Sequence, residues 1–271
     1  MWPDEQNGSG IVVFKYFAIS NRGRHCVTNA DRVMINGNVI VDGELTGSAE
    51  ERLLAVVCDG VNSCNGSHEA ADVAACSLRI AHLDKQDPFS FCSALLWADE
   101  VVKTKQLEKL ELSGIKTTIA ALYIDSDSFL AYNAGDTRIY QLDGGVLKQL
   151  SVDHSLEDEM QTSEKADGLG LPSNSNRVTH YLGSDQSHLR FHITGDIATT
   201  TSCGTFVLCS DGAYAGVPDS KLSAVLSCPS LTLPEKGRLF YALAEANNPS
   251  DNISIVLINI GCASQVGLDL H

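Results

Sequence analysis

The chain has 271 residues, 44% hydrophobic and 20% charged, so it can form a folded core and lacks the biased composition of disordered, collagenous or coiled-coil chains. Its 34 acidic residues outnumber its 19 lysines and arginines, which gives a net charge of -15. A surface this negative repels nucleic-acid phosphates and anionic lipid, so we expect neither a nucleic-acid nor a membrane partner.

Residues 1–10 are expected to be a flexible tail. They contain no basic region followed by an apolar core, and no apolar run in the chain approaches the roughly 18 residues of a membrane span. The chain has nine cysteines, an odd number that cannot all form pairs, and Cys58 and Cys209 lie inside apolar runs. Both observations favour reduced thiols over a disulfide framework. We therefore expect a cytoplasmic protein.

Strand patterns come first along the chain and helical patterns follow. Apolar or alternating runs predict strands over 11–20, 38–42 and 53–58, the last being typical of a buried central strand. Apolar residues at helical spacing predict helices over 67–83 and 88–112, the second beginning at Pro88, a favourable first-turn residue. Two successive helices of this length are expected to form an antiparallel pair.

The second half of the chain returns to strands. Runs over 117–124, 128–133, 138–142 and 146–150, separated by turn residues, predict an antiparallel meander. The polar stretch 151–186 is expected to be an irregular flap with some helix near its start. A strand over 204–210, helices over 219–227 and 234–247, and a strand over 253–260 complete the pattern. Short connections favour one α+β layered domain over 11–262, followed by a tail over 263–271.

Acidic residues stand at strand boundaries. Asp59 and Asp211 directly follow apolar runs, Asp136 follows another, and Asp251 precedes the last strand. Strand ends can aim such side chains at one point, and a cluster of negative charge there requires a cation. Oxygen ligands suit Mg²⁺ or Mn²⁺, and two such ions support hydrolysis of a phosphate ester. Any single Asp-Gly pair is more often an ordinary turn, so the order of the sites carries this hypothesis.

Seven elements from about residue 17 to 260 resemble the metal-dependent protein serine/threonine phosphatases of the PP2C (PPM) family. They are Asn29-Ala-Asp31-Arg32, Val57-Cys-Asp59-Gly60, Thr117-Thr118, Asn133-Ala-Gly135-Asp136-Thr-Arg138, Asp153-His154-Ser155, Leu208-Cys-Ser-Asp211-Gly212 and Asp251-Asn252-Ile-Ser. The resemblance implies a four-layer αββα sandwich, in which two antiparallel β-sheets are each flanked by an antiparallel helix pair.

The resemblance also implies roles for individual residues. Asp59 would bridge two Mg²⁺ or Mn²⁺ ions, with the Gly60 carbonyl on one of them and Asp211 and Asp251 completing the other. Asp136 would hold a third, weaker ion. Asp59 and Asp211 are thus the expected catalytic residues, and Asp31 and Asn252 are expected to support the ligands from beside them.

Two positions depart from the family pattern. Ala30 replaces the expected acidic residue, and Cys26 occupies the place of a phosphate-binding arginine. Arg24 and His25 lie close by in sequence and are candidates for a phosphate contact and a proton donor. The alternative for this pair is an exposed basic turn.

The expected activity is hydrolysis of phosphoserine or phosphothreonine in phosphoprotein substrates by metal-activated water, in a monomer opposed by a serine/threonine kinase. The alternative is a pseudophosphatase, a binding or regulatory module that keeps the fold without turnover.

Overall fold

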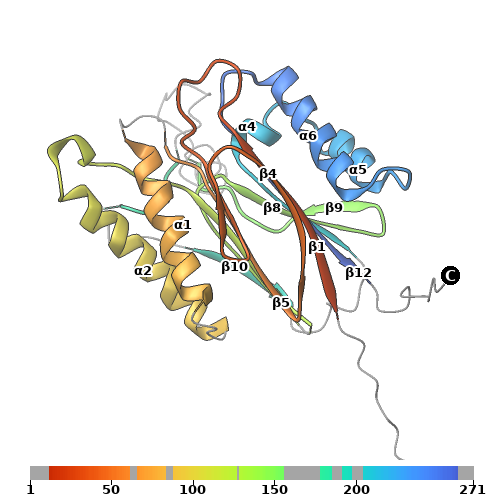
Figure 1. Cartoon of the computed structure of the whole chain (residues 1–271), viewed down its shortest axis with the longest axis horizontal. Coiled ribbons are helices and arrows are strands. Elements are labelled where there is room, and N and C mark those ends of the chain that lie inside the picture. Colours follow the sequence, from red (N-terminus) through yellow and green to blue (C-terminus); the bar gives the residue numbers. More distant parts are fainter. Residues whose placement is uncertain are drawn as a thin grey trace, which may run out of the picture.

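The computed structural model describes residues 12–61, 66–83, 88–126, 128–155, 178–184, 191–196 and 204–261. These residues form two six-stranded sheets that pack face to face, with helices covering the outer face of each (Figure 1). The predicted α+β four-layer sandwich is confirmed.

The first sheet has the strand order β4-β1-β12-β11-β8-β9 and the second has the order β10-β7-β6-β5-β2-β3. In the first sheet the bounds are β4 (Gly43–Glu50), β1 (Val13–Asn21), β12 (Ile253–Gly261), β11 (Thr205–Cys209), β8 (Arg138–Asp143) and β9 (Val146–Gln149). In the second they are β10 (His192–Asp196), β7 (Phe129–Ala134), β6 (Ile119–Asp125), β5 (Arg52–Cys58), β2 (Arg32–Ile35) and β3 (Asn38–Ile40). Neighbouring strands pair antiparallel throughout.

Two groups of helices lie on opposite sides of the paired sheets (Figure 1). Helices α1 (Ser67–Leu83) and α2 (Pro88–Gln106) pack on the second sheet. Helices α4 (Asp211–Tyr214), α5 (Asp219–Ser227) and α6 (Leu233–Asn247) pack on the first. In the described part of the chain, no helix combines the length and apolar character that crossing a membrane requires.

Strand β1 illustrates why the central strands read as continuous apolar runs. Phe14 and Ala18 face the core between the sheets, whereas Phe17 and Ile19 face the core beneath the helices. Because both faces are buried, the strand lacks the polar alternation of a surface strand.

Three strands and one short helix were not predicted. Strand β4 reads Gly-Glu-Leu-Thr-Gly-Ser-Ala-Glu, a polar sequence with two glycines that forms a strand because it pairs along β1 at the sheet edge. Strands β2 and β10 are short and likewise depend on a partner from elsewhere in the chain. The short helix α4 begins at Asp211, immediately after β11.

Two predicted elements need correction. The helix expected over 88–112 ends at Gln106, and a separate 3₁₀ turn, η1 (Leu110–Leu112), follows. Leu107 and Leu110 extend the apolar spacing but are 86% and 92% exposed, so they do not face the core. The expected meander over 117–150 is split: β6 and β7 pair in the second sheet, whereas β8 and β9 pair in the first.

The crossing between sheets occurs at Gly135, whose φ of +108° suits glycine and whose close packing against Thr118 leaves no room for a side chain. The crossing places the following residue, Asp136, where the two sheets meet. The tails over 1–10 and 263–271, and most of the flap with its predicted helix, lie outside the described residues.

Candidate metal centre

Backbone contacts bring the acidic strand boundaries together at one end of the two sheets. The Gly60 N–H donates to the Ala30 carbonyl at 3.2 Å, which joins the end of β5 to the start of β2. The Ala30 N–H donates to Asn252 Oδ1 at 2.8 Å, which joins β2 to the start of β12. The Ser210 N–H donates to the Ser254 carbonyl at 3.1 Å, which adds the end of β11.

Five carboxylates at this end influence one another. Burial and repulsion from Asp211 raise the pKa of Asp136 to about 7 and that of Asp251 to about 6. Burial raises the pKa of Asp31 to about 7, with repulsion from Asp211 and Asp251 adding to it. The pKa of Asp59 is raised well above its usual range by loss of hydration and by the other four carboxylates. The group therefore resists carrying its full negative charge at neutral pH unless a cation is present.

Asp31 shows most clearly that the negative charge of these five carboxylates is not balanced by hydrogen-bond donors. Its side chain is 1% exposed, and neither carboxylate oxygen has a hydrogen-bond partner. The Ser210 and Ser254 hydroxyls lie near enough to oppose the rise in its pKa, but neither makes a hydrogen bond of good geometry with it. Asp136 Oδ1 is also buried without a partner. Buried carboxylate oxygens without donors suit a hard divalent cation, so the residues fit Mg²⁺ or Mn²⁺.

These side chains do not form a closed ligand cage. Within the described ranges, no three histidine, cysteine, aspartate or glutamate side chains already converge as metal ligands. Like charges repel one another, and Mg²⁺ usually keeps several waters while using few carboxylates. The geometry therefore suits ions held by a few carboxylates with waters completing their coordination.

The Asp59-Gly60 segment is fixed by its backbone. The Asp59 carbonyl accepts hydrogen bonds from Thr118 N at 2.8 Å and from Thr117 Oγ1 at 2.9 Å. A Cβ on Gly60 would lie 2.8 Å from the Ala30 carbonyl oxygen, so a side chain does not fit there. No donor from the described residues reaches the Gly60 carbonyl, which leaves this oxygen available to a ligand.

Asn252 supports the group without being charged. It is 3% exposed, and its side-chain amide donates to the carbonyls of Arg22 at 2.9 Å and Thr28 at 3.1 Å while accepting from Ala30. These bonds hold the loop before β2 against the start of β12. Ala30 itself is buried and offers the centre only backbone groups.

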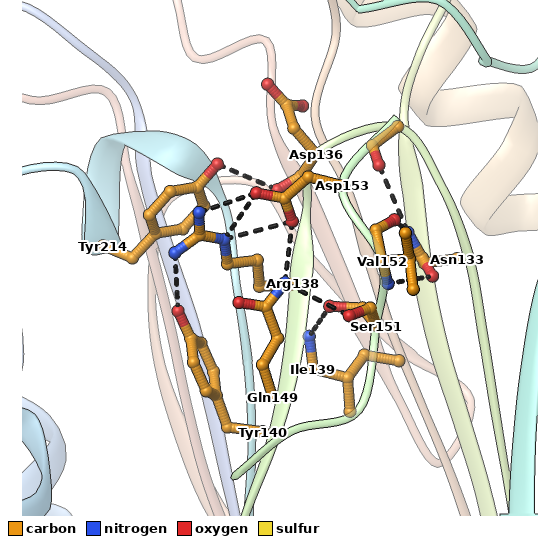
Figure 2. Close-up of polar contacts among 11 residues, drawn as sticks. Asn133, Asp136, Arg138, Ile139, Tyr140, Gln149, Ser151, Val152, Asp153 and Tyr214 are labelled. Carbon is orange, nitrogen blue, oxygen red and sulfur yellow. Dashed lines mark hydrogen bonds and ion pairs between the residues drawn. The ribbon is translucent and has the colours of Figure 1, made fainter. Parts of the chain in front are cut away.

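A second polar network fixes the turn that carries Asp136 (Figure 2). Arg138 Nε and Nη2 donate to Asp153 at distances from 2.6 to 3.1 Å, and Nη1 donates to the Tyr140 hydroxyl at 2.9 Å. The guanidinium also lies 3.8 Å from the ring centre of Tyr214, whose hydroxyl donates to the Asp136 carbonyl at 3.0 Å. Arg138 thus links α4 to the turn between the two sheets.

Replacing Arg138 with lysine is expected to destabilise the protein by about 2 kcal/mol, because lysine keeps the charge but loses the forked hydrogen bonds and the stacking. Thermal unfolding, monitored by circular dichroism, measures the effect. Arg238→Lys is the matched control because Arg238 and its partner Glu44 are both exposed, and its effect should stay below about 0.5 kcal/mol. Equal losses in the two variants would contradict the role given to Arg138.

The sequence matches the family model described as Protein phosphatase 2C over residues 42–245. The chain belongs to the protein phosphatase 2C family. The family predicted from the motifs is confirmed, and with it the enzyme class, a metal-dependent protein phosphatase.

Individual relatives agree with the family. The chain is 28% identical to the serine/threonine phosphatase stp of Listeria monocytogenes over 251 residues, which cover 86% of this chain and 95% of the relative. Stp1 from Staphylococcus aureus superposes with a TM-score of 0.75 at 19% identity, covering 91% of this chain and 94% of that one. The catalytic domain of the phosphatase PstP, solved with two manganese ions, gives a TM-score of 0.72 at 19% identity, covering 92% and 99%.

The loop before β2 carries the departures from the protein phosphatase 2C pattern. Arg24 is exposed and pairs with Glu245 on α6 at 3.0 Å, and His25 is also exposed. The Cys26 thiol donates to the Ser250 carbonyl at 3.2 Å, one residue before Asp251, and burial and repulsion from Asp251 raise the pKa of that thiol. A neutral thiol therefore stands where the family resemblance placed a guanidinium.

Several contributing residues were not predicted. The Ser210 and Ser254 hydroxyls face Asp31, and Tyr214 holds the Asp136 turn. Ser210 stands between the apolar strand β11 and Asp211, and Ser254 interrupts the apolar run of β12 near Asp251. These polar positions are the signal from which the two serines could have been found.

Proposed function

We propose that this protein phosphatase 2C member removes phosphate from phosphoserine and phosphothreonine in proteins, using two Mg²⁺ or Mn²⁺ ions. Asp59, the Gly60 carbonyl, Asp211 and Asp251 would hold the ions, with Asp31 and Asn252 supporting them. The observation that carries the proposal is the group of mutually repelling carboxylates, two of which have buried oxygens without hydrogen-bond partners.

Bound divalent ions would supply Lewis-acid neutralisation of the phosphate charge and activation of a water molecule. The protein's own contribution is to aim oxygen donors from several rigid strands at one place. The raised pKa values of Asp31 and Asp136, both about 7, mean that these carboxyls hold protons near neutral pH when no cation is present. They are expected to release those protons as the ions bind.

A catalytically impaired binding module is the alternative, suggested by Ala30 and Cys26. Two observations favour the enzyme. The remaining carboxylates would destabilise a protein that bound no cation, and the relatives at 27–28% identity are named serine/threonine phosphatases. Water is expected to take the place of the ligand missing at Ala30.

Further expectations extend the proposal. We propose a single domain over 11–262, a third, weaker ion at Asp136, and a substrate contact from Arg24 and His25. A cytoplasmic location, a monomeric state and an opposing serine/threonine kinase remain predictions from the sequence.

A metal-dependent assay tests the activity. Hydrolysis of a phosphothreonine peptide and of a small aryl phosphate is expected with Mn²⁺ and not with EDTA, and Asp211→Asn should lower the rate about a hundredfold. Asp143→Asn, an exposed site at the end of β8, is the control and should keep full activity. Because Arg24 is the proposed phosphate contact, Arg24→Ala should raise KM for both the peptide and the aryl phosphate. Folded protein without any metal-dependent rate would favour the binding module.

A further inference from the structure

A cavity of about 570 Å³ lies on the outer face of the first sheet, beside the start of α6. Lys15 on β1, Ser48 on β4 and Asn259 on β12 line its floor, and Thr232 and Lys236 line its wall. Lys15 is paired across the sheet with both Ser48 and Asn259, so the three side chains share one face. The cavity is thus built from three adjacent strands and one helix end.

The cavity lies where α6 stops packing on the outer face of the first sheet. Gly237 lies so close to Phe17 that an added Cβ would come within 2.2 Å of the ring, which marks where the helix packs tightly on β1. Lys15 is the preceding residue on the same face of β1, beyond this contact. A lysine there, where an apolar residue would extend the core under the helix, leaves a polar hollow.

The cavity carries the charges of two lysines. Among the described residues, neither Lys15 nor Lys236 forms an ion pair, although the chain has 34 acidic residues. Of the acidic residues around the cavity, Glu235 accepts from the Thr232 N–H and hydroxyl, both at 2.7 Å, and Glu44 pairs with Arg238. Glu50 lies on the same face of β4 as Ser48 and forms no ion pair with a described lysine. Two unpaired ammonium groups facing one cavity favour an anionic ligand.

The size and walls of the cavity favour a peptide over a small ion. Its volume falls in the range of ligand pockets and exceeds what one carboxylate or phosphate fills. Leu231, Leu233 and Pro234 add apolar surface beside the lysines. Residues 46–48 belong to β4, an edge strand with no partner strand on its outer side among the described residues, and such an edge accepts an extended peptide.

We propose that this cavity binds an acidic peptide segment of a partner protein, with two of its carboxylates contacting Lys15 and Lys236. Asn259 lies six residues along β12 from Ile253, so the cavity is roughly 20 Å from the strand ends that carry the metal centre. Peptide binding is therefore separable from phosphate hydrolysis, and the two proposals can fail independently.

A fluorescent glutamate-rich peptide titrated into the full chain in Mg²⁺ buffer tests the proposal. The matched glutamine peptide and the double variant Lys15→Gln/Lys236→Gln should each weaken binding about tenfold, the scale expected for two ion pairs. The control Lys148→Gln/Lys221→Gln removes two exposed lysines outside the cavity and should bind as the wild type does. Both double variants should hydrolyse the aryl phosphate normally.

Amide chemical shifts give a second readout that does not depend on any variant folding. Addition of the acidic peptide should move the signals of residues 46–48, 231–233, 235 and 236, since Pro234 has no amide proton. No saturable binding, equal binding by the Lys15→Gln/Lys236→Gln variant, or shifts confined to other residues would each overturn the proposal. Citrate competing as strongly as the peptide would identify a small-anion site and would also overturn it.

Discussion

Asp59→Asn is expected to lower metal-dependent phosphatase activity about a thousandfold, or about 4 kcal/mol in transition-state stabilisation, while making the metal-free protein more stable. The loss of activity follows because Asp59 is the proposed bridge between the two ions. The gain in stability follows because the other four carboxylates repel the Asp59 carboxylate. Removing about 1 kcal/mol of this repulsion raises the Tm by roughly 2 °C in a chain of this size.

The two effects have opposite signs, which separates this account from simple damage to the fold. Activity is measured on the aryl phosphate with Mn²⁺, and the Tm is measured in EDTA. Asp143→Asn, which removes an exposed carboxylate, should change neither quantity. A variant that loses stability along with activity would show that Asp59 serves the fold rather than a charged metal site.

The metal-free protein is expected to lose stability as the pH rises from about 4 to about 7. The folded-state pKa values of Asp31 and Asp136 are about 7 and that of Asp251 is about 6, all raised from 3.8. Between these limits the folded state binds more protons than the unfolded state, so the free energy of unfolding falls as the pH rises. The stabilising contribution of the protonated carboxyls is complete below about pH 4 and is lost through about pH 7.

Mn²⁺ should reverse this loss at neutral pH. Saturation at a thousand times the Kd adds about 4 kcal/mol, equivalent to roughly 8 °C in Tm. Thermal unfolding at pH 5 and pH 7.5, with and without Mn²⁺, measures both effects. Asp31→Asn should flatten the pH dependence in EDTA, since it removes one of the titrating groups. A pH-independent Tm in EDTA, together with no Mn²⁺ effect at pH 7.5, would contradict the prediction.

Sequence patterns predicted the elements whose burial is complete on both sides. The runs that became β5 and β11 are continuously apolar and end at Asp59 and Asp211, so the strand and the acidic boundary are both visible in the sequence. The order of the seven motifs then supplied the family, which no single Asp-Gly pair could have supplied.

Features that depend on partners distant in the chain were not predictable. The polar strand β4 exists because β1 offers a partner, and the split of the expected meander depends on the turn at Gly135. The contact of Arg138 with Tyr214 joins residues far apart in sequence, and the pairing of Arg24 with Glu245 likewise spans most of the chain. The pattern of residues within a short stretch of sequence does not indicate such contacts.

The departures in the loop before β2 bear on how the phosphate charge is neutralised. Cys26 supplies no guanidinium and Ala30 supplies no carboxylate. Neutralisation of the phosphate charge therefore depends more on the proposed ions. This chain should therefore depend on added divalent metal more steeply than a relative that keeps an arginine and an acidic residue at these positions.

Isothermal titration of Mn²⁺ into the EDTA-treated full chain at pH 7.5 tests most directly whether the carboxylates form a metal centre. The account predicts saturable binding of two ions, with affinity lost in Asp59→Asn and unchanged in Asp143→Asn. A folded wild-type protein that shows no saturable Mn²⁺ binding, or that binds as tightly after Asp59→Asn, would contradict it.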